Sequence, residues 1–396
     1  MERIVYTSQE DVVYAFESLI NQKEAFEMKL LTRDIIKSSE LVLYGAGNMG
    51  LAAVQWLQYY GLKIKYLIDS NEEKRGTFIA GCPVINPKDI PDTDKDQCLF
   101  LVCVVTAPYS DMYSLLSELG CKIVYPAWDI IDLFNRYNKI LCGWSCADIA
   151  DEDLTSCKKV FTVLADDISK AHYFQALSWR IHRKEVFISY APILRDNKYF
   201  PIDIPINLIT DEVFVDCGAY NGNTLDTFIK RTEGKFKSIY AFEPSTEGFA
   251  ALNEFISNNK LANRTELYQI GLGSRDENVF FNDSMGDECH FTSEKKDTSK
   301  QRLKLDTILK EKDFTYIKVH AEGDDFDIII GGINVISKQR PIIAITTFHN
   351  RNDFFNIPDF FITHLLNYSF YFRAYCYCGI ETVLYAVPNE RKRKER

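Results

Sequence analysis

The sequence predicts an α/β fold built from two Rossmann-like sheets, a smaller one followed by a larger one. Two segments each contain an apolar strand, a glycine-rich turn, a helix and a second strand that ends in an acidic residue. The first segment runs from Gly45 to Asp69 and the second from Asp216 to Glu243. Near the carboxyl terminus, two apolar strands flank Gly379 and predict a β-hairpin at the end of the second sheet.

Length and composition indicate an ordinary globular protein. The chain has 396 residues, of which 46% are hydrophobic and 26% are charged, and this size suggests two domains. Its formal net charge of −10 gives no general attraction to nucleic acid, so we expect no nucleic-acid partner. No secretory signal pattern opens the sequence, and no apolar run reaches the length of a membrane span. A cytoplasmic location is therefore expected.

The eleven cysteines indicate core residues rather than a metal or disulfide framework. They are scattered, and several lie in apolar runs, as Cys103 does among leucine, valine and phenylalanine. Cys142 with Cys146, and Cys376 with Cys378, lack the paired Cys-x-x-Cys spacing of structural zinc sites. We expect free thiols in a reducing compartment.

The first domain, residues 1–140, opens with a predicted helix over residues 8–38. Ser8 and Asp11 form a capping box, and Val12 and Phe16 belong to one apolar face. That face is expected to pack on the domain that follows. A contact within a homo-oligomer is the alternative that stays open.

A complete Gly-x-Gly-x-x-Gly fingerprint follows at Gly45, Gly47 and Gly50. An apolar strand precedes it, a helix follows it, and the next strand ends at Asp69, 24 residues after Gly45. In dinucleotide-binding folds such glycines let a pyrophosphate approach the backbone, and the acid accepts hydrogen bonds from a ribose. The pattern predicts a nucleotide-binding module. Glycines that serve only tight packing are the alternative, and we weigh the two equally.

Two more buried strands, over 99–105 and 122–125, and a helix over 111–119 complete the first domain. Residues 141–200 are expected to be a helical connector, with a helical region over 151–183. The connector either links the two domains as a simple bundle or closes over a cofactor as a lid.

The glycine-rich turn of the second α/β unit differs from the Gly-x-Gly-x-x-Gly motif of a dinucleotide site. Its turn and flanking strand ends supply six expected cofactor contacts: Asp216, Gly218, Ala219, Gly222, Thr224 and Glu243. Asp216 would repel a pyrophosphate but suits the ammonium group of an amino-acid-like ligand, and Glu243 can accept from a ribose diol. S-adenosylmethionine (AdoMet) carries both groups. We therefore expect AdoMet at this turn.

These residues resemble the FkbM family of AdoMet-dependent methyltransferases. The resemblance rests on Asp216-Cys-Gly-Ala-x-x-Gly-x-Thr224 and on Ala241-Phe-Glu-Pro244, and later segments agree with it. It implies the class I methyltransferase fold, a Rossmann-like sheet with a terminal antiparallel strand, over residues 201–388. Residues 389–396 are then a basic tail, expected to be solvated and frayed.

The first domain carries a resemblance of its own. Its run from Ile68-Asp69-Ser-Asn71 through Gly76 to Gly81-Cys-Pro-Val-Ile85 is similar to the small amino-terminal domain of bacterial sugar-modifying acyltransferases. This similarity implies a nucleotide-linked sugar as the ligand of residues 1–140.

The fourth strand of the second sheet is expected to carry the chemistry. Alternation along residues 316–323 places Lys318, His320 and Glu322 on one side, at the ligand edge of the sheet. The FkbM family usually has an Asp where this chain has His320, which puts the family role of that acid in doubt. His349 follows the fifth strand and matches a His of the family.

We expect His320, Glu322 and His349 to be catalytic groups. An imidazole is a plausible base for a hydroxyl proton at neutral pH. The same three side chains would suit a divalent metal, and we leave that alternative open. A third interpretation is that both histidines are hydrogen-bonded structural residues.

The resemblance implies an O-methyltransferase whose acceptor is a sugar or glycan precursor in surface polysaccharide biosynthesis. Two alternatives stay open. One is an NAD(P)-dependent enzyme that modifies a nucleotide sugar through the Gly45–Asp69 segment. The other is a non-catalytic scaffold that binds AdoMet or a nucleotide, and His320 in place of an acid favours it.

Overall fold

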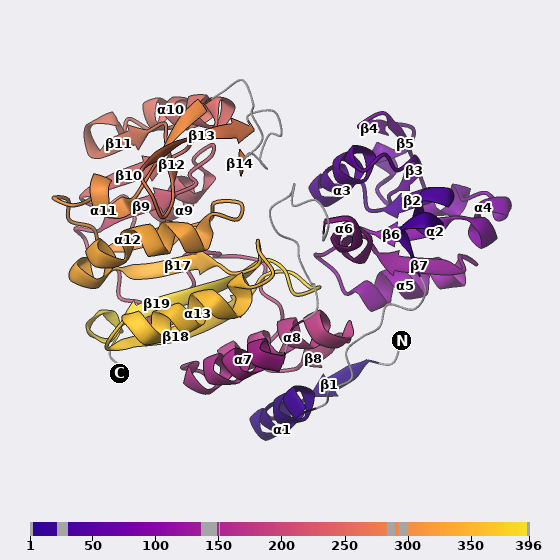
Figure 1. Cartoon of the computed structure of the whole chain (residues 1–396), viewed down its shortest axis with the longest axis horizontal. Helices are drawn as coiled ribbons and strands as arrows, with labels where there is room; N and C mark the ends of the chain where they lie inside the picture. Colours follow the sequence, from indigo (N-terminus) through magenta and orange to yellow (C-terminus); the bar gives the residue numbers. More distant parts are fainter. Residues whose placement is uncertain are drawn as a thin grey trace. The chain divides into compact units, whose positions relative to one another are not determined.

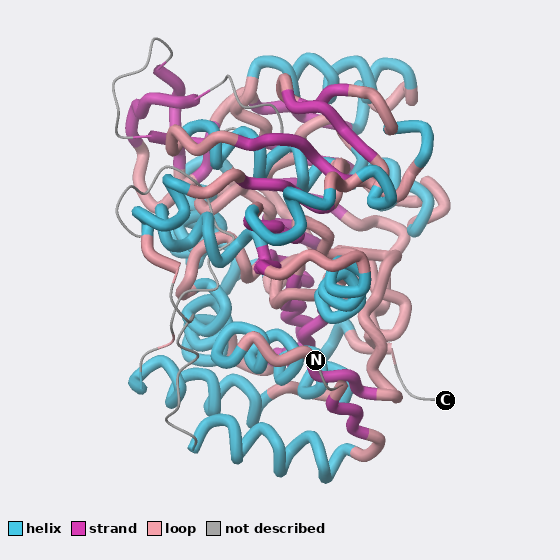
Figure 2. The backbone as a smooth tube through the Cα atoms, turned by 90° about the vertical axis from the view of Figure 1, so that its right-hand side faces the viewer, coloured by secondary structure: helices cyan, strands magenta, loops and turns pink. Residues whose placement is uncertain are grey.

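The structure is a computed structural model, and it divides into two compact units. It describes residues 3–21, 31–135, 149, 151–282, 290–292 and 299–393. The first unit comprises Met1–Ala150, Ala171–Ile193 and Ala374–Ile380, and the second comprises Asp151–Lys170, Leu194–Arg373 and Glu381–Arg396. The expected connector, 141–200, is thus shared between the two units. Figure 1 labels the elements along the chain, and Figure 2 colours the helices and strands of the backbone.

A six-stranded sheet forms the core of the first unit, in the order β4-β5-β3-β2-β6-β7. Its strands are β2 (Leu41–Tyr44), β3 (Ile64–Ile68), β4 (Phe78–Ile79), β5 (Cys82–Ile85), β6 (Leu99–Val102) and β7 (Ile123–Pro126). The central strand β2 pairs in parallel with β3 and β6, and every residue of β2 and β6 is buried. Burial on both faces explains why these strands are uninterrupted apolar runs.

Helices and a small parallel strand pair accompany this sheet. The helices are α1 (Gln9–Asn21), α2 (Arg33–Ser38), α3 (Asn48–Tyr59), α4 (Asp92–Gln97), α5 (Tyr109–Glu118) and α6 (Ala127–Asn135). Strand β1 (Ile4–Tyr6) pairs with β8 (Val186–Ile188). The Ser8 hydroxyl accepts from the Asp11 amide at 3.1 Å and so caps α1, as expected. The middle of the expected 8–38 helix, residues 22–30, lies outside the described residues.

The second unit is built on a seven-stranded sheet, in the order β11-β10-β9-β16-β17-β19-β18. Its strands are β9 (Val213–Cys217), β10 (Ser238–Phe242), β11 (Thr265–Tyr268), β16 (Tyr316–Val319), β17 (Ile342–Thr346), β18 (Tyr368–Ala374) and β19 (Thr382–Pro388). Strands β9, β10, β11, β16 and β17 are parallel, whereas β19 runs antiparallel to β17. The expected reversed strand at the end of a parallel sheet is confirmed.

Helices and aromatic side chains build the core around this sheet. The described helices of this unit are α7 (Asp151–Val163), α9 (Asn223–Arg231), α10 (Thr246–Asn258), α11 (Leu305–Ile308), α12 (Asp325–Gln339) and α13 (Asp353–His364). Helix α8 (Asp167–His182) begins in this unit, and its residues from Ala171 onward belong to the first unit. Helix α13 packs against α7 and α12. The Phe228 ring of α9 stacks on Phe214 of β9, with ring centroids 4.5 Å apart. The ring centroid of Phe200, which precedes β9, lies 5.5 Å from that of Phe214.

A second, four-stranded sheet lies within this unit, in the order β12-β15-β13-β14. Its strands are β12 (Gly271–Leu272), β13 (Glu277–Asn282), β14 (His290–Thr292) and β15 (Ser299–Leu303). Short 3₁₀ turns in the described part of the chain are η1 (Glu72–Lys74), η2 (Pro87–Asp89), η3 (Ala262–Arg264) and η5 (Asn389–Arg391).

The expected helical region over 151–183 is two helices, because the chain between α7 and α8 pairs with a strand. Leu164 forms an isolated bridge with Phe370 of β18, and the Ala165 amide donates to the Phe370 carbonyl at 2.8 Å. The Asp166 carboxylate then accepts from the Ser169 amide at 2.7 Å, at the start of α8. This bridge joins residues far apart in the sequence.

The expectation of a frayed basic tail is wrong for its described part, residues 389–393. The Arg391 guanidinium forms an ion pair with buried Glu212 and donates to the Asn207 carbonyl at 3.1 Å. The Arg393 amide donates to the Pro205 carbonyl at 2.9 Å. These bonds tie the end of the chain to the segment before β9.

The described cysteines are all buried except Cys376, which agrees with their expected role as small core residues. No helix among the described residues is long and apolar enough to span a bilayer.

Candidate functional site

The turn after β9 needs glycine at two positions. Gly218 (φ +80°) and Gly222 (φ +87°) adopt left-handed backbone conformations. A Cβ on Gly218 would lie 1.9 Å from the His320 carbonyl oxygen, and one on Gly222 would lie 2.7 Å from the Phe255 ring. Gly218 therefore lets the turn pass directly against the segment that follows β16.

The other expected contacts of this turn are placed beside it. The Gly218 and Ala219 amides both donate to the Phe242 carbonyl at 3.0 Å, which ties the turn to the end of β10. Ala219 is buried. Thr224 lies in the first turn of α9 and is partly exposed.

Asp216 is fully buried and forms an ion pair that the sequence analysis did not foresee. Its Oδ1 lies 2.9 Å from Lys318 Nζ, which also donates to the Gly218 carbonyl at 2.6 Å. Burial raises the pKa of Asp216, and the Lys318 ammonium opposes that rise. Asp216 Oδ2 is buried and has no hydrogen-bond partner among the described residues. One oxygen of this carboxylate is therefore left as an acceptor.

Glu243 joins the ends of β9 and β10. Its Oε2 accepts from the Tyr220 amide at 2.8 Å and its Oε1 accepts from the Ser245 amide at 2.8 Å. A Cβ on Gly248 would lie 3.1 Å from the Glu243 carboxyl carbon, so the start of α10 packs closely on this side chain. Each carboxylate oxygen keeps a second lone pair that a hydroxyl can use.

The side chains of His320, Glu322 and His349 converge at the carboxyl ends of β16 and β17. One ligand atom from each lies within 4.8 Å of the other two. His320 Nε2 lies 2.8 Å from Glu322 Oε1, and His349 Nε2 lies 3.5 Å from Glu322 Oε2. We call these three residues the His–Glu–His cluster. The structure brings together the three side chains expected to be catalytic.

Three further side chains contact or support the cluster and were not expected at the site: Asp325, Thr346 and Tyr199. His349 Nδ1 lies 2.7 Å from Asp325 Oδ2, and the Thr346 hydroxyl donates to Asp325 Oδ1 at 2.6 Å. The Tyr199 hydroxyl forms a hydrogen bond with His320 Nδ1. Asp325 carried a signal, because it follows Glu322 by three residues at a helix start. Tyr199 lies 121 residues before His320, and no local pattern in the sequence links the two residues.

Glu322 does not reach the cluster by strand alternation, so that part of the expectation is wrong. Strand β16 ends at Val319. The Asp325 carboxylate accepts from the Ala321 and Gly323 amides, both at 3.1 Å, and turns the chain into α12. Glu322 adopts a left-handed conformation, with φ +46°. Such a conformation is costly outside glycine and is often found at functional sites.

Burial and mutual attraction shift the pKa values within the cluster. Burial alone would raise the pKa of Glu322, but His349 and then His320 outweigh it and lower this pKa to about 2. Burial alone would lower the pKa of His349, but Asp325 and Glu322 raise it to about 9. Burial lowers the pKa of His320, and Glu322 opposes that change. These shifts favour the ionised form of Glu322 and the protonated form of His349, and they disfavour protonation of His320.

The glycine fingerprint of the first unit has mixed roles. Gly45 has φ +109°, and a Cβ there would lie 2.8 Å from a Val104 methyl group. A Cβ on Gly50 would lie 1.9 Å from the Gly45 carbonyl oxygen, so α3 packs directly on the turn. Gly47, at the N-terminus of α3, has open space around its Cα. Two of the glycines therefore serve packing, whereas Gly47 is exposed and packs against no neighbouring segment.

The Asp69 carboxylate already accepts hydrogen bonds from other residues of the first unit. Its Oδ2 accepts from the Ala46 amide at 2.9 Å and from Lys74 Nζ at 3.0 Å, and its Oδ1 accepts from the Asn71 amide at 2.9 Å. Burial would raise the pKa of Asp69, but these donors outweigh it and lower the pKa. A ribose hydroxyl would have to share this carboxylate with three existing donors.

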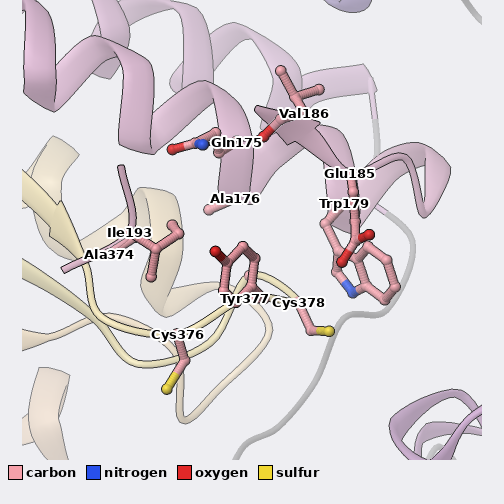
Figure 3. Close-up of a pocket in the computed structure, with 11 residues that line it drawn as sticks. Gln175, Ala176, Trp179, Glu185, Val186, Ile193, Ala374, Cys376, Tyr377 and Cys378 are labelled. Carbon is pink, nitrogen blue, oxygen red and sulfur yellow. Dashed lines mark hydrogen bonds between the residues drawn. The ribbon is translucent and has the colours of Figure 1, made fainter. Parts of the chain in front are cut away.

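A pocket within the first unit contains none of the expected site residues (Figure 3). Gln175, Trp179 and Cys376 are among the residues that line it. Glu185, also in its wall, accepts from the Ser110 amide at 2.9 Å at the start of α5.

Comparison with known proteins identifies the second unit. The family model for the methyltransferase FkbM domain matches residues 216–375. The fold of the chain is similar to the crystal structure of methyltransferase FkbM from Methylobacillus flagellatus, with a TM-score of 0.68 and 16% identity. That similarity covers 96% of this chain and 100% of the other.

A curated relative matches a shorter part of the chain. It is the redox-sensing transcriptional repressor Rex of Bacillus subtilis, 30% identical over 100 residues, which are 25% of this chain and 46% of the repressor. The match therefore spans less than half of the repressor. The family match, by contrast, runs from Asp216 beyond the whole His–Glu–His cluster. Residues 216–375 of this chain form a domain of the FkbM methyltransferase family.

Proposed function

We propose that this protein is an AdoMet-dependent O-methyltransferase that acts on a hydroxyl of a sugar or glycan precursor. One observation carries the proposal. The turn expected to bind the cofactor packs against the His320 backbone, since Gly218 has no room for a Cβ there. A cofactor-binding turn and a set of groups suited to hydroxyl chemistry thus meet at one edge of the sheet.

The turn fits AdoMet in two respects. The orphaned Oδ2 of Asp216 is an acceptor for a buried ammonium group. The Glu243 carboxylate is held by two backbone amides and can accept from a ribose diol with its remaining lone pairs. When bound, AdoMet supplies an electrophilic methyl group on a sulfonium.

The residues of this chain must align the acceptor hydroxyl and exclude water. They must also accept the hydroxyl proton or weaken the bond that holds it. His349 is buried and His320 and Glu322 are partly buried, so the protein shields these side chains from much of the solvent. Methyl transfer would form a carbon–oxygen bond and break the carbon–sulfur bond of AdoMet, and the hydroxyl proton would pass to a base or to solvent. Positioning and proton removal are the two contributions expected of the protein.

The glycan acceptor rests on the resemblances of the sequence and on the open space at Gly47. We propose that the first unit binds a nucleotide sugar through the turn at Gly47 and that the protein acts in the cytoplasm. Calorimetry with uridine diphosphate sugars and with NAD, on the full chain and on Gly47→Val, tests this ligand. Binding of NAD alone would favour the dehydrogenase alternative, and binding of neither ligand would leave the fingerprint a packing device.

Loss of the protein is expected to remove one methyl group from a surface glycan. Mass spectrometry of glycans from cells with and without the protein measures this difference directly. Glycans of identical mass in the two strains would contradict a role in their methylation. In that case AdoMet binding, measured separately, would still decide whether the protein is a methyltransferase with a different acceptor.

A further inference from the structure

We infer that the His–Glu–His cluster is a binding site for one divalent transition-metal ion. The ligands are His320 Nε2, His349 Nε2 and the Glu322 carboxylate. Whether the ion binds follows from the cluster alone. What the ion does there rests on the proposed function.

The convergence of ligand atoms is the first support. Both imidazoles direct Nε2 at the same carboxylate, one at each of its oxygens, at 2.8 Å and 3.5 Å. The three ligand atoms lie within 4.8 Å of one another. Tetrahedral ligands that share an ion at about 2.1 Å lie about 3.4 Å apart, so binding the ion needs side-chain shifts on the order of one ångström.

The outer shell is the second support. A metal-bound histidine almost always donates its other ring N–H to a carboxylate, a carbonyl or water, which fixes the ring and its tautomer. His349 Nδ1 faces Asp325, which Thr346 and two backbone amides hold in place. His320 Nδ1 faces the Tyr199 hydroxyl. Both rings are therefore anchored at Nδ1 and can present Nε2 as a ligand.

Access to the cluster suits a catalytic ion rather than a structural one. The His349 side chain is 1% exposed, whereas those of His320 and Glu322 are 22% and 24% exposed. Three protein ligands and one accessible side leave a coordination position for a substrate oxygen. Two imidazoles and one carboxylate favour Mn²⁺, Fe²⁺, Co²⁺ or Zn²⁺ over Mg²⁺, which prefers oxygen ligands.

An ion at this position would help to remove the proton of the acceptor hydroxyl, which the proposed function requires. A hydroxyl that coordinates a divalent cation loses its proton more readily. The acceptor oxygen would then attack as an alkoxide, and its proton would pass to solvent or to a nearby base.

The test uses the full chain, stripped with a chelator and titrated with CoCl₂, without AdoMet. Visible absorption reports nitrogen and oxygen ligation, and elemental analysis gives the stoichiometry. We expect one Co²⁺ per chain, at least tenfold weaker binding by Glu322→Gln and His349→Ala, and about 10- to 100-fold weaker binding by the positioning variant Asp325→Asn. His364→Ala is the control, because His364 is exposed on α13 and lies outside the cluster.

Two results would overturn the site: no stoichiometric Co²⁺ on the wild-type chain, or full affinity in both Glu322→Gln and His349→Ala. The near-isosteric Glu322→Gln guards against a loss that reflects misfolding, since circular dichroism should match the wild type. AdoMet binding is measured separately. Co²⁺ binding without AdoMet binding would contradict the proposed function and support the metal site. AdoMet binding without Co²⁺ binding would contradict the metal site and leave the proposed function standing.

Discussion

Replacing Glu322 by Gln is expected to slow methyl transfer by about 10²-fold or more while AdoMet affinity stays within about threefold of wild type. Glu322 is the carboxylate that both imidazoles of the cluster face. The substitution keeps the shape of the side chain but removes its charge. The loss should therefore fall on the reacting hydroxyl, whether Glu322 orients a base or holds a metal ion.

The rate is measured as S-adenosylhomocysteine released when glycan precursors from cells that lack the protein serve as acceptor. Glu247→Gln is the matched control, because Glu247 is exposed in the first turn of α10. His320→Ala and His349→Ala extend the test to the rest of the cluster. If all three cluster variants turn over within about threefold of wild type, the histidines and Glu322 are structural residues.

Replacing Glu243 by Ala is expected to weaken AdoMet binding by roughly 10- to 100-fold. A hydrogen bond to a charged group contributes about 1.5–3 kcal/mol, which corresponds to one to two decades in Kd. The variant also frees the Tyr220 and Ser245 amides, which the carboxylate now holds at 2.8 Å each. Isothermal titration calorimetry with AdoMet measures the change. Glu247→Ala should bind as the wild type does, and equal affinity in Glu243→Ala would remove the ribose assignment.

Most of the fold could be predicted because buried parallel strands are continuous apolar runs of distinctive composition. The two turns with glycine and a following acid, and the reversed strand near the carboxyl terminus, were identified in this way. The break between α7 and α8 was not predicted. It depends on pairing between Leu164 and Phe370, which no local pattern reveals.

The sequence predicted which residues belong to the site, but not the hydrogen bonds and ion pairs between them. Lys318 was expected beside His320, yet it lies directly opposite Asp216 in the register of β16 and β9 and forms an ion pair there. Strand register is a property of two distant segments, so one segment cannot disclose it. Tyr199 reaches His320 from a loop 121 residues earlier in the chain, which is again a long-range contact.

Titration of the full wild-type chain with AdoMet and with S-adenosylhomocysteine is the most direct measurement of what the turn at Asp216 binds. A methyltransferase with the orphaned Asp216 oxygen and the Glu243 carboxylate at its cofactor site should bind both ligands saturably, one per chain. Binding of neither ligand by a folded chain would contradict the proposed function.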